Sequence, residues 1–202
     1  MPQHQMPHTF PSPPAWIAIG ALLFIFSGCA SNPIVTGKSS AGASATNTKI
    51  PITTTSADAR SLYLQGLSVT DQLRAHDGRA LFEQAVAKDP AFAMAHYNLA
   101  LVATTPKVFS EQMKTAVSQS ATVTEGERLL ILALQARANV DQAKSLQYTA
   151  QLVTKFPRDE RARMALGLAY FAQQDYEKAA VEFKQAIEIE PSFSPAYNML
   201  GY

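Results

Sequence analysis

Residues 160–193 read ERARMALGLAYFAQQDYEKAAVEFKQAIEIEPSF and carry the clearest pattern in this 202-residue sequence. Apolar residues recur at helical spacing through the segment, and Pro191 follows the second apolar run. Because proline cannot continue an established helix, we expect a pair of helices, over 160–172 and 175–189, that ends before Pro191.

The same arrangement recurs along the chain at a fixed period. Pro90 and Pro157 also follow amphipathic stretches, and the three prolines are separated by 67 and 34 residues. Self-similarity at a period near 34 residues is typical of stacked helical hairpins. An unrelated amphipathic bundle is the alternative that this spacing argues against.

The residues at fixed places in this period resemble the tetratricopeptide repeat. Leu166, Gly167 and Tyr170 fall at positions 7, 8 and 11 of that family's pattern. Its later positions are matched by Tyr176, Ala179, Phe183, Ala186 and Pro191. The pattern restarts at Tyr197, Leu200 and Gly201, whereas the copies before residue 160 are degenerate.

The resemblance implies an all-α fold, an α-α superhelix of helical hairpins over residues 57–202. In such hairpins small residues such as Gly167 and Ala179 let paired helices approach closely. We expect the pairs 57–74 with 78–88, 93–104 with 107–119, 125–138 with 141–155, and 160–172 with 175–189. A ninth helix is expected from about residue 194, and its early end predicts a fragment of a longer protein.

The chain begins with a segment unlike the repeats. Residues 1–28 contain no Asp, Glu, Lys or Arg, and residues 15–26 form a 12-residue apolar run. A membrane-spanning helix needs about 20 such residues, so the run has the length of a signal-peptide core. We therefore predict a signal peptide over 1–28.

Phe26-Ser27-Gly28-Cys29 resembles a bacterial lipobox, although Phe26 replaces the usual leucine and no basic residue precedes the core. The resemblance implies that Cys29 is lipidated, with acyl chains such as palmitate holding the protein to a membrane. A buried apolar helix with a core cysteine is the alternative.

Residues 29–56 are rich in Ser, Thr and Ala, and this composition predicts a flexible tether behind the lipidated cysteine. Ala30 and Ser31 stand where an aspartate commonly retains such lipoproteins in the inner membrane. The resemblance therefore implies the outer membrane of a bacterial cell envelope, with the repeats facing the periplasm.

Several kinds of chemistry find no support in the residues. One cysteine excludes an internal disulfide framework, and His76 and His96 lack metal-ligand spacing. Basic residues are scattered and the net charge is +1, which argues against a nucleic-acid partner. We predict no enzyme activity, no metal and no cofactor.

By resemblance, the first helix of each pair lines a concave face that binds peptides. The positions that face this groove nominate Tyr97, Asn98, Arg137, Arg161, Met164 and Leu168. Met94, Leu101, Leu130, Leu134 and Phe171 occupy equivalent positions. The two arginines can pair with a carboxylate of the ligand, while the apolar members either contact it or pack the stack.

The leading hypothesis is a membrane-anchored lipoprotein that acts as a protein-interaction scaffold or adaptor in the cell envelope. The alternative is a recognition arm of a larger enzyme or sensor whose functional domain lies beyond Tyr202.

Overall fold

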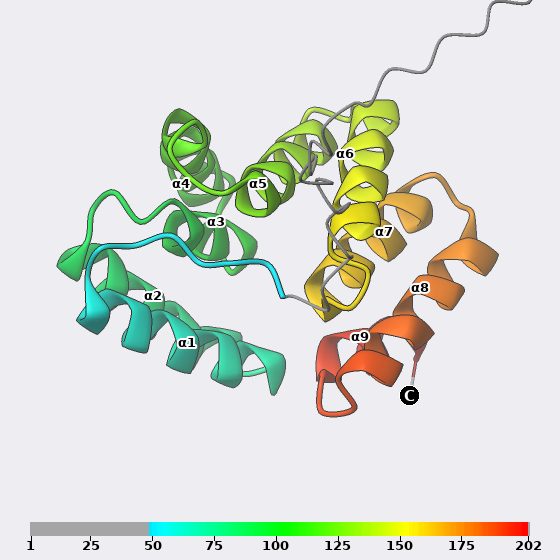
Figure 1. Cartoon of the computed structure of the whole chain (residues 1–202), viewed down its shortest axis with the longest axis horizontal. Coiled ribbons are helices and arrows are strands. Elements are labelled where there is room, and N and C mark those ends of the chain that lie inside the picture. Colours follow the sequence, from blue (N-terminus) through cyan, green and yellow to red (C-terminus); the bar gives the residue numbers. More distant parts are fainter. Residues whose placement is uncertain (1–48, 202) are drawn as a thin grey trace, which may run out of the picture. The chain divides into compact units, whose positions relative to one another are not determined.

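The computed structural model describes residues 49–201, all within one compact unit of the chain. These residues are helical apart from residues 49–56 and the short connections between helices (Figure 1). Nine helices lie in this range and form consecutive hairpins. Their bounds are α1 Ala57–Asp71, α2 Ala75–Lys88, α3 Ala93–Leu101, α4 Pro106–Gln119, α5 Glu125–Ala138, α6 Gln142–Lys155, α7 Glu160–Ala172, α8 Tyr176–Ile189 and α9 Ser194–Leu200. The predicted all-α fold and the four helix pairs are confirmed, and α5 and α7 have the predicted bounds.

Polar side chains fix where most of these helices begin. Asp141, Asp159 and Asp175 accept hydrogen bonds from backbone N–H groups of the first turns of α6, α7 and α8. At α5, Thr124 and Glu127 form the predicted capping box, in which each side chain accepts from the other's backbone N–H. These caps satisfy N–H groups that have no partner inside the helix.

The turns inside three hairpins share one backbone conformation. Leu73, Val140 and Gln174 have φ values of 61°, 59° and 63°, in the left-handed region. They are spaced 67 and 34 residues apart, which is the spacing of the three repeat prolines. The left-handed residue explains why α1 ends at Asp71, earlier than predicted, and α2 begins at Ala75. The second repeat lacks this turn, because α3 ends at Leu101 and Pro106 starts α4.

Close contact between paired helices depends on glycine at one repeat position. A Cβ added at Gly66 would lie 2.5 Å from Phe82 Cε1, and one added at Gly167 would lie 2.4 Å from Phe183 Cε1. Both phenylalanines are fully buried, as is Ala179. A phenylalanine ring therefore covers a glycine at equivalent positions of the first and fourth repeats.

Each helix packs against the next along the chain, and the first helices of neighbouring pairs also meet, α3 with α5 and α5 with α7. The larger buried cluster runs from α1 to Ala162 of α7. A second cluster holds the C-terminal hairpins together and consists of Ala179, Phe183, Ala186, Phe193 and Ala196.

The last residues of the tether predicted over 29–56 are not free of the helices. Residues 49–55 form an extended segment that leads into α1 (cyan in Figure 1) and hydrogen-bonds to side chains of the helical array. Composition alone does not predict these contacts, because most of their partners lie 35 to 111 positions away in the sequence. The predicted signal peptide and Cys29 lie outside the described residues. Within the described part, no helix is both long and apolar enough to cross a membrane.

Candidate functional site

The first helices of the pairs surround a cavity of about 400 Å³, the inner cavity. Residues of α1, α3, α5 and α7 line most of it, and the rest of the lining consists of Leu73, Ala75, Val102, Ser145, Thr149, Phe193 and Pro195. All six residues nominated from the sequence line this one cavity: Tyr97, Asn98, Arg137, Arg161, Met164 and Leu168. Helical periodicity explains the convergence, because equivalent positions of stacked repeats face the same side.

Most of the inner cavity's wall is apolar. Leu130 and Leu134 are buried, while Leu101 keeps 45% of its surface exposed at the opening. Phe171 was expected on the same wall but does not line the cavity. Its ring packs edge-on against Tyr176, with centroids 5.2 Å apart, and both side chains are exposed.

Asn98 is buried, and its amide is engaged inside the protein. Asn98 Nδ2 donates to Tyr63 Oη and to the carbonyl oxygen of Met94, each at 3.0 Å. Burial raises the pKa of Tyr63, so its hydroxyl stays protonated. The bond to Tyr63 ties α3 to α1, and the two bonds together fix the amide at the cavity wall.

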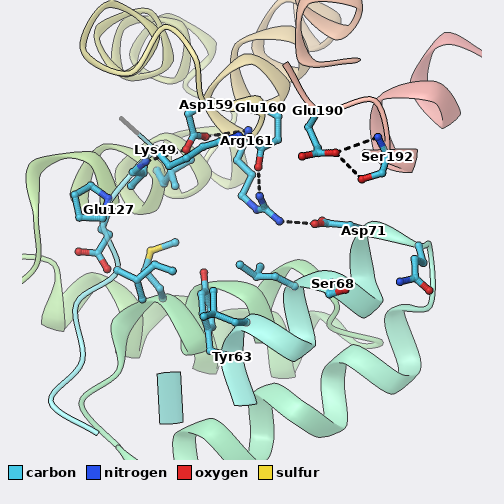
Figure 2. A pocket seen from close by; sticks show the side chains of 18 residues that line it. Lys49, Tyr63, Ser68, Asp71, Glu127, Asp159, Glu160, Arg161, Glu190 and Ser192 are labelled. Atoms are coloured by element: carbon cyan, nitrogen blue, oxygen red, sulfur yellow. Dashed lines mark hydrogen bonds and ion pairs between the residues drawn. The ribbon is translucent and has the colours of Figure 1, made fainter. Parts of the chain in front are cut away.

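Arg137 and Arg161 stand in different electrostatic surroundings. Arg161 Nη2 donates to Asp71 Oδ2 at 2.5 Å, and Arg161 Nη1 pairs with Glu160 (Figure 2). The guanidinium also lies 5.6 Å from the centre of the Phe193 ring. Burial lowers the pKa of Arg161, but the carboxylates of Asp71 and Glu160 outweigh it and raise this pKa above its usual value.

Arg137 is half-buried and makes no ion pair with any residue that the structure describes. Burial raises the pKa of the neighbouring Tyr97 hydroxyl, and the positive charges of Arg137 and Arg161 partly oppose that rise. The inner cavity therefore offers one guanidinium, that of Arg137, for a charged ligand, beside the already paired Arg161.

A second cavity of about 460 Å³ adjoins the first, and the sequence did not point to it. Lys49, Ile50, Pro51 and Ile52 form part of its wall, together with residues from α1, α3, α5 and α7. Lys49 lies beside Asp159 and Glu160 (Figure 2). Three buried acids meet the extended segment here: Glu127, Asp159 and Glu160. Of these three acids, the sequence predicted a role at a helix start only for Glu127, through its capping box.

Other polar groups of the array serve packing. His96 is buried, with Nδ1 2.7 Å from Gln112 Oε1 and Nε2 3.1 Å from the carbonyl oxygen of Pro90. Over residues 49–201 no three His, Cys, Asp or Glu side chains gather as a metal site would require.

Comparisons with known families identify the repeats in two segments. A profile described as tetratricopeptide repeat matches residues 63–105, and one described as TPR repeat matches residues 167–202. A search of curated protein sequences gave no significant match.

Solved structures with some similarity include PilW, described as a widely conserved type IV pilus biogenesis factor. It is 16% identical with a TM-score of 0.46, and the match covers 70% of this chain and 66% of PilW, just under two thirds of its length. MamA from Desulfovibrio magneticus RS-1 is 20% identical with a TM-score of 0.36, over 67% of this chain and 77% of MamA.

Proposed function

We propose that this array binds an extended segment of a protein partner in its inner cavity. The described helices form tetratricopeptide repeats, and such repeats are a scaffold for protein–protein interaction. The observation that carries the proposal is the convergence of six residues from three repeats around one cavity. A cavity of about 400 Å³ can take a few side chains of such a segment.

The lining indicates the chemistry of the partner segment. Leu101, Met164 and Leu168 offer apolar contact, which supplies most of the binding free energy through buried area. Arg137 offers a guanidinium that can form two parallel hydrogen bonds with a carboxylate. The partner segment therefore carries apolar side chains and either an acidic side chain or a free C-terminal carboxylate.

Arg161 has a supporting role in this proposal. Since it already pairs with Asp71 and Glu160, a ligand carboxylate would compete with two carboxylates for its guanidinium. We assign carboxylate recognition to Arg137, and to Arg161 the role of holding α1 and α7 at the cavity rim.

The test is binding to an array of ten-residue peptides of varied sequence with free C-termini. The folded chain should retain peptides that combine apolar residues with a carboxylate, and Arg137→Gln should weaken their retention about tenfold, the worth of one charge-assisted hydrogen bond. Arg128→Gln, an exposed change on the same helix, is the matched control. Equal retention by both variants would contradict the proposal.

We further propose that a lipidated Cys29 anchors the repeats to a membrane, with the outer membrane of a bacterial envelope as its location and the periplasm as the side it faces. The support is the 12-residue apolar run followed by Ser27-Gly28-Cys29. Cys29→Ala should release the repeats from membranes or leave an unprocessed precursor. A cleaved Cys29→Ala protein that still fractionates with membranes would refute the anchor.

A further inference from the structure

Residues 49–54, which we call the strap, are held by side chains that recognise its main chain. Asp159 Oδ2 accepts from the Ile50 N–H at 2.9 Å, and Glu127 Oε1 accepts from the Thr53 N–H at 2.7 Å. Arg60 Nη1 donates to the Ile52 carbonyl oxygen at 3.0 Å. Groups of the peptide backbone occur in every segment, so these three contacts do not require this particular sequence.

Side chains of the strap add contacts that do depend on sequence. The Lys49 ammonium pairs with Glu160, and Thr53 Oγ1 donates to Glu127 Oε2 at 2.5 Å. Ile50 and Ile52 pack against the larger buried cluster. A Cβ on Gly126 would lie 2.9 Å from Ile50 Cγ2, so glycine leaves the room that this isoleucine occupies.

The way the strap is attached resembles a bound peptide more than an element of the fold. Over the described residues, no backbone–backbone hydrogen bond joins the strap to a helix. Three of the receiving groups are carboxylates at the starts of α5 and α7: Glu127, Asp159 and Glu160. Arg60 of α1 and Asp89, at the end of α2, hold the strap's last residues, Asp89 by accepting from Thr54 Oγ1 at 2.5 Å. Lys49, by contrast, keeps 53% of its side chain exposed.

We propose that these helix starts form a second docking site, distinct from the inner cavity, in which the strap is a displaceable occupant. The partner that displaces it is an extended segment of the same chemistry: a lysine, two apolar residues two positions apart, and a threonine or serine. Glu160 selects the cationic side chain and Glu127 selects the hydroxyl, while Asp159 accepts a backbone N–H. Each of these buried carboxylates loses water on burial and needs a donor in return. This second docking site does not depend on whether a ligand binds in the inner cavity.

The experiment uses the full-length chain in detergent and a fluorescent peptide with the sequence of residues 47–56, NTKIPITTTS. Ile50→Asp/Thr53→Asp places new carboxylates against Asp159 and Glu127 and should free the site. Thr55→Asp, an exposed change two residues on, is the matched control. A peptide with the same composition in scrambled order controls for non-specific binding.

The double variant should bind the peptide at least about tenfold more tightly than the wild type or Thr55→Asp, because occupied sites lower the apparent affinity. Adding Glu160→Gln should remove the gain, since it deletes the partner of the peptide's lysine. A double variant that is folded by circular dichroism but binds no better than Thr55→Asp would overturn the inference.

Amide hydrogen exchange of the wild-type chain decides the matter if the double variant does not fold. A displaceable strap opens without unfolding the helices, so the Thr53 amide should exchange at least about 100-fold faster than the Leu130 amide in the core of α5. Equal exchange rates would show that the strap is a fixed part of the fold and would overturn the inference.

Discussion

At the residue scale, single positions set how closely the helices approach and how the chain turns between them. Gly66 and Gly167 occupy equivalent places, and each lies directly beneath a buried phenylalanine ring. Val140 occupies a turn position whose left-handed backbone disfavours a branched side chain. The two glycines suit the close helix contact in which they lie. Val140, by contrast, adopts a backbone conformation that lowers the stability of the chain.

Gly167→Ala should lower the free energy of unfolding by about 1–2 kcal/mol. The new methyl group would lie 2.4 Å from Phe183 Cε1, and overpacking of this kind typically costs about 1–3 kcal/mol, of which better helix propensity returns up to about 1 kcal/mol. Urea denaturation measures the loss. Combining Gly167→Ala with Phe183→Leu should cost less than the two changes summed, and strict additivity would contradict the contact.

Val140→Gly should raise the free energy of unfolding by roughly 0.5–1 kcal/mol. Val140 has φ 59° and is 77% exposed, so the change relieves a left-handed conformation that costs about 1–2 kcal/mol without removing a buried contact. Thermal and urea denaturation give the comparison. Val181→Gly, at an exposed helical position of α8, should instead destabilise the chain, and the same sign for both changes would refute the explanation.

At the element scale, two polar groups join segments that are far apart in the sequence. Glu127 is fully buried and accepts hydrogen bonds from both the start of its own helix and the strap. The Asp71–Arg161 pair joins the end of α1 to the start of α7, 90 residues away. Both connect elements that do not follow one another along the chain.

Glu127→Gln should destabilise the chain by about 2 kcal/mol. The carboxylate accepts from Thr53 and Thr124, each through both N–H and hydroxyl, and an amide replaces one of its acceptor oxygens with a donor. Glu125→Gln, on the exposed side of the same helix turn, should change stability by less than about 0.5 kcal/mol. Similar losses for the two variants in urea denaturation would contradict the special role of Glu127.

Asp71→Asn should alter how stability depends on pH. Burial raises the pKa of Asp71 above its ordinary 3.8, although Arg161 opposes that rise. The folded chain therefore binds the Asp71 proton more tightly than the unfolded chain does. The resulting contribution to stability is complete below pH 3.8 and is lost as pH rises through the raised pKa.

The variant cannot titrate at this position, so the difference in unfolding free energy between wild type and Asp71→Asn should fall as pH rises from about 4 and then become constant. Urea denaturation of both proteins across this range provides the measurement. A difference that grows with pH would mean that Arg161, and not burial, governs Asp71.

The sequence allowed the helices and the inner cavity to be predicted, because both follow from periodicity. Cavity-facing positions recur at one spacing, and the left-handed turn recurs in three of the four hairpins, so a single clear repeat locates the others. The strap could not be predicted in this way. Lys49 and Thr53 lie in a stretch rich in threonine and serine, and their partners are distant acids that only the stacked helices bring within reach. The alternating Ile50 and Ile52 were the only local sign of burial.

At the scale of the whole array, stacking creates surfaces that no single repeat possesses. The inner cavity needs side chains from α1, α3, α5 and α7 together, and the neighbouring acidic site needs α5 and α7. Six residues line both cavities and place them side by side: Tyr63, Leu67, Asp71, Met94, Leu130 and Arg161. A scaffold of this kind can hold one partner segment in the inner cavity while the strap occupies the adjoining site.

Site-directed photo-crosslinking in cells tests the central claim, that the inner cavity binds a protein segment. A benzophenone amino acid in place of Leu101, 45% exposed at the cavity opening, should crosslink a partner peptide that contains apolar residues and a carboxylate. The same group in place of Val181, 52% exposed on α8 and outside the cavity, should not crosslink that peptide, and Arg137→Gln should weaken the crosslink from position 101. A partner captured equally from position 181, or no capture from position 101 in a chain with unchanged melting, would contradict the claim.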